Sequence, residues 1–185
     1  DDHGALAGRV GCAGHEAGLR ECATKARVVF VHQTAVFIAA GMNGEDLLAD
    51  APEAIEAVHR AYFEAGADIA ITASYQASFE GFAARGLSRS DTERLLQRSV
   101  TLAQAAREHV ASNAPASTRD QWVAASVGPY GATLHDGSEY RGDYGLDEDA
   151  LADFHRPRMV ALLGAGPDLL ACETLPSLLE ARAIV

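Results

Sequence analysis

Polar and ionisable side chains recur at the ends of three short apolar runs of this sequence. Thr72 lies near the end of the first run and Ser74 and Tyr75 follow it, Ser126 lies near the end of the second, and Glu173 follows the third. Hydroxyl groups can bind polar substrate atoms, and a carboxylate can hold an ammonium group or act as a base. Two alternatives are open: a polar loop that binds nothing after the first run, and a helix-capping or salt-bridged role for Glu173.

The second apolar run ends in a glycine-containing segment. Gly128 and Tyr130 follow Ser126, and a glycine lets a substrate approach the backbone closely. Ser126 and Tyr130 are therefore candidate substrate-binding residues, with a plain turn as the alternative. Cys172 is expected to be a small buried strand residue rather than a ligand or nucleophile. His155 lies within a predicted helix, where we expect a structural role.

The three apolar runs, near residues 68–73, 122–127 and 168–172, are predicted to be buried strands, and helical patterns separate them. The expected helix starts are Asp50 with Pro52 in the first turn, a capping box from Ser90 to Glu93, Asp147, and the region of Ser177. Pro157 is expected to kink the third of these helices, because proline removes an amide donor.

Regular alternation of helices and strands predicts a parallel α/β sheet covered by helices. A doubly wound sheet and a (β/α)₈ barrel share this local pattern. The sequence has no G-x-G-x-x-G after a strand and no Walker lysine loop, which disfavours a nucleotide-binding sheet. A barrel needs roughly 200 residues or more. We therefore expect about the first half of a TIM-type barrel, whose catalytic mouth lies at the carboxyl ends of the strands.

Composition excludes several partners. The 185 residues carry a formal net charge of −11, which argues against nucleic acid or an anionic membrane as the main partner. Three cysteines are too few for a disulfide framework and fit a reducing cytoplasm. The longest apolar-rich run, 28–40, is too short to span a bilayer. The chain begins Asp1-Asp2-His3, without the basic residues of a secretory signal or an initial Met, so its true start is expected to lie elsewhere.

Residues 1–46 form an atypical segment with no clear helical or strand periodicity, apart from apolar stretches at 28–31 and 36–38. Cys12, His15, Cys22 and His32 invite a zinc interpretation. Zinc modules usually carry their ligands in tight pairs, and only Cys12 and His15 are close here. We therefore assign no metal ligand in this segment.

Several motifs, in order and at their spacing, closely resemble the homocysteine S-methyltransferase family. They are ITASYQASFEGFAARGL, ASVGPYGATLHDGSEYRGDY, FHRPR and DLLACETLP, and the resemblance runs from about Leu47 to Val185. It is greatest to the bacterial branch that uses S-methylmethionine or S-adenosylmethionine. The resemblance implies a (β/α)₈ barrel in which zinc binds homocysteine as a thiolate, which attacks the methyl group of a sulfonium donor. It also implies that Glu173 engages the homocysteine amino group and that Tyr75 lines the donor side.

The sequence also departs from the family pattern. The family's three zinc-binding cysteines lie in Asn-Cys and Gly-Gly-Cys-Cys motifs, which this chain lacks, and Cys172 is not one of them. The first-strand Asp-Gly-Gly motif is only weakly matched by Asp2-His3-Gly4. We expect residues 47–185 to be the N-terminal half of a homocysteine-binding barrel domain. A frameshift upstream of Leu47 is one hypothesis for residues 1–46, and an intact frame on resequencing would contradict it.

Two functional outcomes follow from this resemblance. In the first, the chain belongs to a zinc-dependent methyltransferase whose other residues complete the site. In the second, it is a truncated, non-catalytic half-barrel that binds ligand weakly or assembles with a partner. We expect the printed chain by itself to be inactive and to lack stoichiometric zinc. The sequence does not choose between the two methyl donors and leaves the oligomeric state open.

Overall fold

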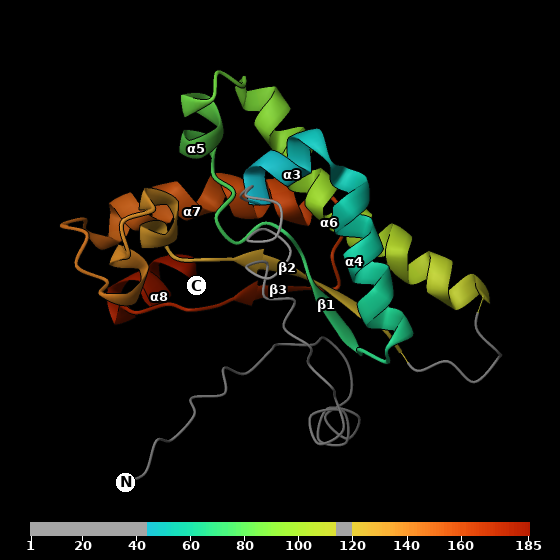
Figure 1. Cartoon of the computed structure of the whole chain (residues 1–185). Coiled ribbons are helices and arrows are strands. Elements are labelled where there is room, and N and C mark those ends of the chain that lie inside the picture. The colour runs from blue at the N-terminus through green and yellow to red at the C-terminus, as the bar shows by residue number, and fades with distance from the viewer. Residues whose placement is uncertain (1–43, 114–119) are drawn as a thin grey trace, which may run out of the picture.

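Three parallel strands form the centre of the molecule. The computed structural model describes residues 44–113 and 120–185, and Figure 1 shows their arrangement. Strands β1 (Ile69–Ile71), β2 (Trp122–Val127) and β3 (Leu169–Cys172) form one sheet in the order β1-β2-β3. Both strand pairs are parallel. The three strands predicted from the apolar runs are confirmed, with small differences at their ends.

The strand order supports the barrel interpretation. Each strand pairs with the next one along the chain, Ile69 opposite Trp122 and Ala124 opposite Leu169. A doubly wound sheet reverses its strand order at a switch point, whereas a (β/α)₈ barrel adds strands in sequence order. The fold class is therefore mixed α/β with the parallel sheet of a TIM-type barrel.

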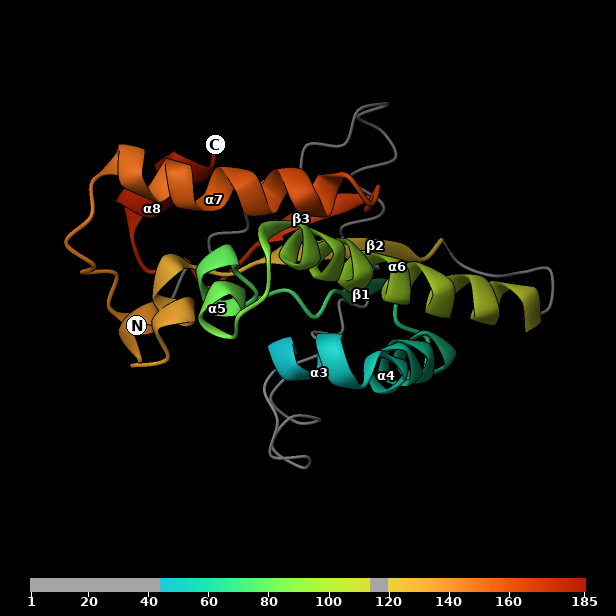
Figure 2. The same ribbon diagram turned by 90° about the horizontal axis from the view of Figure 1, so that it is seen from above.

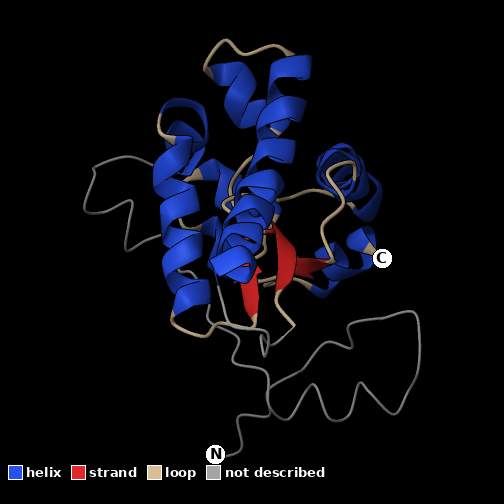
Figure 3. Cartoon of the chain, turned by 90° about the vertical axis from the view of Figure 1, so that its right-hand side faces the viewer, coloured by secondary structure: helices blue, strands red, loops and turns tan. Residues whose placement is uncertain are grey.

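The helices alternate with the strands along the chain. Their bounds are α3 Gly44–Asp50, α4 Pro52–Glu64, α5 Phe79–Ala84, α6 Arg89–Asn113, α7 Glu148–Leu163 and α8 Leu178–Ile184, with short 3₁₀ helices η1 Tyr130–Leu134 and η2 Ser138–Tyr140. Figure 2 shows α4, α6 and α7 side by side in sequence order. Figure 3 shows that these helices lie on one side of the sheet. No helix in the described ranges is long and apolar enough to cross a membrane.

Side chains alternate between the two faces of β2. Val123, Ala125 and Val127 belong to the main apolar cluster, which includes the buried faces of α4 and α6. Ala124 and Ser126 are equally buried but point to the opposite face, since neighbouring strand residues alternate. Ser126 is thereby directed away from the helices, which in a barrel is the inner side.

Two predicted helix starts are confirmed. The Asp147 carboxylate accepts a hydrogen bond from the Ala150 amide at the start of α7, and the Ser177 hydroxyl accepts one from the Glu180 amide at the start of α8. Such bonds satisfy amides that lack a partner within the helix. Helix α7 continues through Pro157, and the expected kink there stays a prediction.

Two other predicted starts were wrong. Asp50 is the last residue of α3, so its backbone is already helical, and Ala51 occupies the N-cap of α4 without a side-chain bond. The capping box of α6 is formed by Ser88 and Asp91 rather than Ser90 and Glu93. Each of the two side chains accepts a hydrogen bond from the other residue's amide, at 3.2 and 3.3 Å. Ser90 lies inside the first turn.

Helices α3 and α5 were not predicted. Helix α5 lies in the segment after β1 and begins after Ser78, whose hydroxyl accepts a hydrogen bond from the Gly81 amide at 3.0 Å. It buries Phe82. One capped turn with one buried aromatic residue is too short to produce a helical period in the sequence.

Several sequence expectations lie outside the described residues. They include the possible strands at 28–31 and 36–38 and the zinc interpretation of Cys12, His15, Cys22 and His32. Nearly all of the atypical segment 1–46 falls there too.

Candidate functional site

Ser126 and Glu173 meet at the carboxyl ends of β2 and β3. The Ser126 hydroxyl donates a hydrogen bond to Glu173 Oε1 at 2.5 Å. The Glu173 amide donates to the Val127 carbonyl at 3.2 Å, which continues the parallel ladder beyond β3. A hydroxyl bonded to a carboxylate makes a short, strong contact. The carboxylate is thus oriented by a neighbouring strand at the end where barrel enzymes place their catalytic residues.

Thr72 and Ser74 connect the ends of β1 and β2 through buried hydrogen bonds. Ser74 Oγ donates to the Ser126 carbonyl at 2.8 Å, and the Ser126 amide donates to Thr72 Oγ1 at 3.0 Å. The two hydroxyl oxygens are 2.7 Å apart. Since the single Ser74 proton points to the carbonyl, Thr72 is the donor between the two hydroxyls. Both side chains are fully buried. The Thr72 hydroxyl thus links strands, and its contact with a substrate stays a prediction.

Tyr75 lies half-buried in the loop after β1 and packs against Gly128. A Cβ added at Gly128 would lie 2.5 Å from the Tyr75 carbonyl oxygen and 2.7 Å from two ring atoms. Burial raises the pKa of the Tyr75 hydroxyl to about 12; the adjacent Thr174 side chain opposes this, and the Glu139 and Glu173 carboxylates add to it. The Tyr75 hydroxyl therefore stays protonated and lies close to Glu173. The Tyr75 ring has room only because residue 128 is a glycine, which has no side chain.

Thr174 has a left-handed backbone conformation directly after Glu173. Its φ is +57°, which is unfavourable for a β-branched residue. Such strain persists only where the surroundings hold it, and it occurs often at functional sites. The Thr174 side chain lies beside the Tyr75 hydroxyl. The ends of β1 and β3 therefore meet through Tyr75 and Thr174.

Tyr130 begins η1, at the exit of β2. Its ring packs against Tyr144 with centroids 5.3 Å apart and edge-on against Phe154 at 5.0 Å. Its amide donates to Glu180 Oε1 at 2.5 Å. Tyr130 is thus held by Tyr144, α7 and α8 together, and its contact with a substrate stays a prediction.

Glu180 is a fully buried carboxylate in the first turn of α8. Its Oε1 lies 2.9 Å from Nε2 of His155, which is also fully buried, in addition to accepting the Tyr130 amide. The nearby carboxylate helps to raise the pKa of Tyr144 to about 12, after the larger effect of burial. His155 therefore lies in an interior contact between α7 and α8, as its expected structural role requires.

Arg158 lies one turn beyond His155 and is fully buried. Its Nη1 donates to the Gly128 carbonyl at 3.0 Å, and its Nη2 donates to the carbonyls of Ser74 and Tyr75 at 3.2 and 3.0 Å. One guanidinium group thereby joins the loops that leave β1 and β2. A planar fork of donors suits such an arrangement, and a lysine ammonium does not reproduce it.

Cys172 is exposed at the end of β3, contrary to the expectation of a buried strand residue. Strand β3 is less covered than β2, which is why its last side chain reaches solvent. Partial desolvation nevertheless raises the pKa of the Cys172 thiol, and the Glu173 carboxylate adds to this while Arg158 opposes it. A raised thiol pKa disfavours the thiolate that nucleophiles and metal ligands require.

The described part of the chain does not fit a zinc site. Cys172 is its one cysteine, and no group of three His, Cys, Asp or Glu side chains within 44–113 and 120–185 could hold a metal ion. We therefore derive no chemical step through zinc from these residues.

The structure brings the five predicted site residues to the same end of the sheet, but only some of them contact Glu173 or lie near it. Ser126 contacts Glu173 directly, and Tyr75 lies near Glu173. Thr72 accepts the hydrogen bond of the Ser126 amide, and Tyr130 begins η1 after β2.

Sequence reasoning missed Arg158 and Glu180. A signal for Arg158 was present: Leu151, His155, Arg158 and Leu162 recur at spacings of four, three and four residues, and all four are buried. A cation within the apolar stripe of a helix needs partners in the interior. Glu180 carried a weaker signal, since Ser177 and Glu180 match a capping box. Its carboxylate instead reaches Tyr130 and His155.

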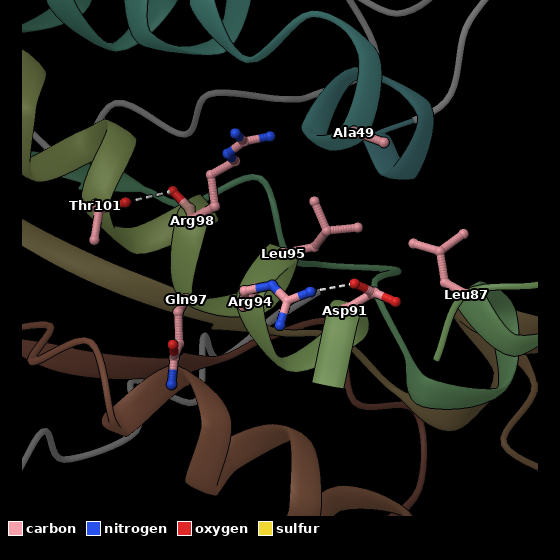
Figure 4. Close-up of a pocket in the computed structure, with 8 residues that line it drawn as sticks. All are labelled: Ala49, Leu87, Asp91, Arg94, Leu95, Gln97, Arg98 and Thr101. Atoms are coloured by element: carbon pink, nitrogen blue, oxygen red, sulfur yellow. Dashed lines mark hydrogen bonds and ion pairs between the residues drawn. The ribbon is translucent and has the colours of Figure 1, made fainter. Parts of the chain in front are cut away.

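A shallow hollow on the outer helical layer is separate from this site (Figure 4). It is lined by Ala49, Leu87, Asp91, Arg94, Leu95, Gln97, Arg98 and Thr101, which come from α3, α6 and the segment before α6. Arg94 pairs with Asp91 there, and Arg98 donates to the Leu48 carbonyl. None of the predicted site residues lines it, so we place the functional site at the strand ends.

Comparisons with known proteins show which family this chain is similar to. The family model described as homocysteine S-methyltransferase matches residues 19–185. Homocysteine S-methyltransferase YbgG of Bacillus subtilis is 57% identical over 145 residues, which cover 75% of this chain and 45% of the relative. The homocysteine S-methyltransferase of Escherichia coli is 56% identical over 139 residues, which cover 75% of this chain and 44% of the relative.

Solved structures show the same likeness. The crystal structure of the metallated form of homocysteine methyltransferase MmuM from Escherichia coli superposes with a TM-score of 0.78 at 48% identity. The match covers 89% of this chain and 60% of that chain. The oxidised form of the same protein also gives a TM-score of 0.78, at 46% identity.

The chain spans less than half the length of the two curated relatives named above. The family match begins upstream of Leu47, and the boundary between residues 46 and 47 stays a prediction.

Proposed function

This chain belongs to the homocysteine S-methyltransferase family, and on that premise we propose that the protein methylates homocysteine to give methionine. The methyl donor is a sulfonium compound, either S-methylmethionine or S-adenosylmethionine. Residues 47–185 would supply the N-terminal half of the barrel domain that holds the two substrates. The relatives named above are homocysteine S-methyltransferases by name, which supports a reaction of this class.

The reaction is a nucleophilic substitution at a methyl carbon. The homocysteine sulfur forms a bond to the methyl group, and the bond from that group to the sulfonium sulfur breaks. The electron pair of the broken bond stays on the departing sulfur, which becomes a neutral thioether. The thiol proton of homocysteine passes to solvent. Binding both substrates in line supplies much of the rate, because the reaction becomes effectively unimolecular.

Glu173 is proposed to bind the ammonium group of homocysteine, as the family resemblance implies. Its contact with Ser126 supports this role, because the hydroxyl fixes the carboxylate while leaving it negatively charged. Thr72 is proposed to support Ser126 from the neighbouring strand. The pocket wall would thus be built from three adjoining strands.

Tyr75 is proposed to line the side of the pocket that receives the methyl donor. An aromatic face attracts a sulfonium or other cation, and a carboxylate nearby strengthens that attraction. The raised pKa of Tyr75 keeps its hydroxyl neutral, so it can donate a hydrogen bond at physiological pH. Tyr130 is proposed to border the same pocket from the β2 exit.

Zinc is expected for the complete protein because the family resemblance implies it. The described residues offer no set of ligands, so the ligands would have to come from elsewhere in the protein. Metal analysis of the whole protein tests this expectation independently of activity. We also propose a cytoplasmic location and small-molecule substrates, which agree with the sparse cysteines and the acidic charge.

The contact between Ser126 and Glu173 carries this proposal, since it orients a carboxylate at the catalytic end of the sheet. The test uses the whole protein with homocysteine and a donor bearing a deuterated methyl group. Labelled methionine, detected by mass spectrometry, is expected with one or both donors. Its absence with both donors would refute the proposal. The same assay on residues 1–185 alone tests whether this stretch turns over by itself.

A Glu173→Ala variant tests the role of the carboxylate. It is expected mainly to raise the KM for homocysteine, because the ammonium group loses its counter-charge. Glu148→Ala, which removes an exposed carboxylate from the first turn of α7, is the matched control. An unchanged KM for homocysteine in Glu173→Ala would overturn this role.

A further inference from the structure

The segment that follows β2 carries a carboxylate to which the proposed reaction gives no role. Glu139 lies in η2 and is half-buried. The buried Ser138 before it donates a hydrogen bond to the Gly131 carbonyl at 3.4 Å. A Cβ added at Gly131 would lie 2.6 Å from the Glu139 amide nitrogen. The backbone of Glu139 is therefore packed against η1, at the exit of β2.

The other end of η2 packs against the segment that follows β3. The amides of Arg141 and Gly142 donate to the Ser138 carbonyl at 2.9 and 3.1 Å, which turns the chain after η2. A Cβ added at Gly142 would lie 3.0 Å from the Cβ of Ser177, the N-cap of α8. The segment 138–142 thus contacts the chain leaving β2 at one end and the chain leaving β3 at the other.

The side chain of Glu139 lies near Tyr75, which comes from the exit of β1. Burial is the main cause of the raised pKa of Tyr75, and the Glu139 and Glu173 carboxylates add to it. Charges act on a hydroxyl in this way only from a short distance, since water screens them. Two carboxylates, one from η2 and one from the end of β3, therefore lie near the same tyrosine.

None of the groups seen beside Glu139 neutralises its charge. Burial keeps the Tyr75 hydroxyl protonated. The Tyr140 hydroxyl hydrogen-bonds the Glu139 carboxylate, which raises the pKa of Tyr140 and keeps it neutral as well. In the part of the chain that the structure describes, no basic side chain pairs with Glu139, and Arg141 pairs with Asp143 instead. A cationic ligand group would be attracted to this position.

The two proposed substrates offer two kinds of cation. The sulfonium group of the donor loses its charge as the methyl group leaves. A carboxylate in direct contact with it would stabilise the substrate more than the transition state and would slow the step. The α-ammonium groups of the donor and of homocysteine keep their charge throughout. A carboxylate on an ammonium group therefore improves binding without slowing methyl transfer.

We propose that Glu139 binds the α-ammonium group of the methyl donor, while Glu173 binds that of homocysteine. This inference rests on the proposed function for the identity of the two substrates. It assigns one carboxylate to each ammonium group, with Tyr75 close to both. It also names the part of the donor that is recognised: the amino-acid end, which S-methylmethionine and S-adenosylmethionine share.

The direct test is a binding comparison with two ligands and no homocysteine. The first is S-methylmethionine, and the second is 4-(dimethylsulfonio)butanoate, which keeps the sulfonium and carboxylate groups and lacks only the amino group. Ligand-observed NMR titration of the whole protein measures both affinities, including weak ones. Glu139→Gln is expected to lower the affinity for S-methylmethionine about 10- to 100-fold, because a hydrogen bond between charged groups is lost.

The affinity of Glu139→Gln for the deaminated ligand should stay within about twofold of that of the unmodified protein. The difference between the two ligands isolates the ammonium contact, as in a double-mutant cycle. Equal losses for both ligands would mean that Glu139 acts on the sulfonium group or through the fold. That result, an unchanged affinity for S-methylmethionine, or no binding of S-methylmethionine to the unmodified protein would overturn the proposal.

Asp143→Asn is the matched control. Asp143 lies four residues after Glu139, its side chain is 74% exposed, and the variant removes the same amount of negative charge. Its affinities for both ligands are expected to stay within about twofold of those of the unmodified protein. A loss as large as that of Glu139→Gln would show that the general charge of this segment attracts the donor, and would contradict a specific contact.

Steady-state kinetics in the whole protein give a second readout. Glu139→Gln should raise the KM for the donor about 10- to 100-fold and change kcat and the KM for homocysteine less than about twofold. A merely structural role would lower the fraction of active enzyme, and so reduce kcat alone. A change in kcat alone, or a rise in the KM for homocysteine alone, would overturn the assignment.

The two experiments separate this inference from the proposed function. If the unmodified protein makes no methionine from either donor, the proposed function fails. A loss of S-methylmethionine binding in Glu139→Gln, with binding of the deaminated ligand unchanged, would still establish the ammonium contact. If methionine is made and the two ligands lose affinity equally, the proposed function stands and the role of Glu139 is wrong.

Discussion

The Ser126 hydroxyl lies 2.5 Å from Glu173 Oε1 and joins the carboxyl ends of β2 and β3. Ser126 is fully buried, so this hydroxyl is available to Glu173 rather than to solvent. We therefore expect Ser126 to influence substrate binding through the orientation of the Glu173 carboxylate.

Ser126→Ala is expected to raise the KM for homocysteine about 10- to 100-fold, because a hydrogen bond to a charged group is lost. Steady-state kinetics in the whole protein measure this effect. Ser99→Ala is the control, since the Ser99 hydroxyl is equally buried but donates to the Leu96 carbonyl within α6. If both variants have the same KM as the unmodified protein, Ser126 does not orient Glu173.

His59 makes the stability of the fold depend on pH. It lies in the buried stripe Ile55–His59–Phe63 of α4, and burial lowers its pKa from 6.5 to about 4. The unfolded chain binds the proton more readily, so stability from this residue is present above pH 6.5 and is lost as the pH falls toward 4. The full effect is about 3 kcal/mol.

His59→Leu should remove this dependence, because leucine fills similar space without a titrating group. Urea unfolding between pH 4 and 7 is the measurement. The free energy of unfolding of His59→Leu, relative to that of the unmodified protein, should increase as the pH falls from 6.5 toward 4. His109→Gln, at an exposed position of α6, is the control. A constant difference between His59→Leu and the unmodified protein at every pH would contradict the assignment.

Glu180 should be the carboxylate whose loss is most damaging to the interior. Glu180→Ala leaves the Tyr130 amide and His155 Nε2 without their acceptor, at an expected cost of about 3–5 kcal/mol. Glu180→Gln keeps an oxygen acceptor and should cost about 1–3 kcal/mol. Denaturant unfolding checks both values. Glu148→Gln, an exposed position in α7, should stay within about 0.5 kcal/mol. A Glu180→Ala variant of unchanged stability would show that these contacts contribute nothing.

The start of α6 offers a direct test of the corrected cap. Ser88→Ala removes the hydroxyl that accepts the Asp91 amide and should cost about 1 kcal/mol. Ser90→Ala, inside the first turn, should stay within about 0.5 kcal/mol. Thermal or urea unfolding separates them. A larger cost at Ser90 than at Ser88 would return the cap to Ser90.

Local patterns were sufficient for most of the fold. The apolar runs at 68–73, 122–127 and 168–172 became the three strands, since a buried parallel strand needs a continuous run of apolar side chains. Local patterns placed the start of α6 wrongly, because two candidate capping residues lie close together in the sequence. Ser88 and Ser90 both precede an acidic residue by three positions, and only the backbone conformation decides between them.

The sequence by itself determined that Ser126 and Glu173 lie at the same end of one sheet, because parallel strands align their carboxyl ends. Only the tertiary structure decided what each polar group contacts. The Thr72 hydroxyl links β1 to β2, and the Arg158 guanidinium joins two loops more than twenty residues away from it. Periodicity reports which face of an element is buried, whereas a hydrogen bond between distant residues depends on angles and distances that the whole fold sets.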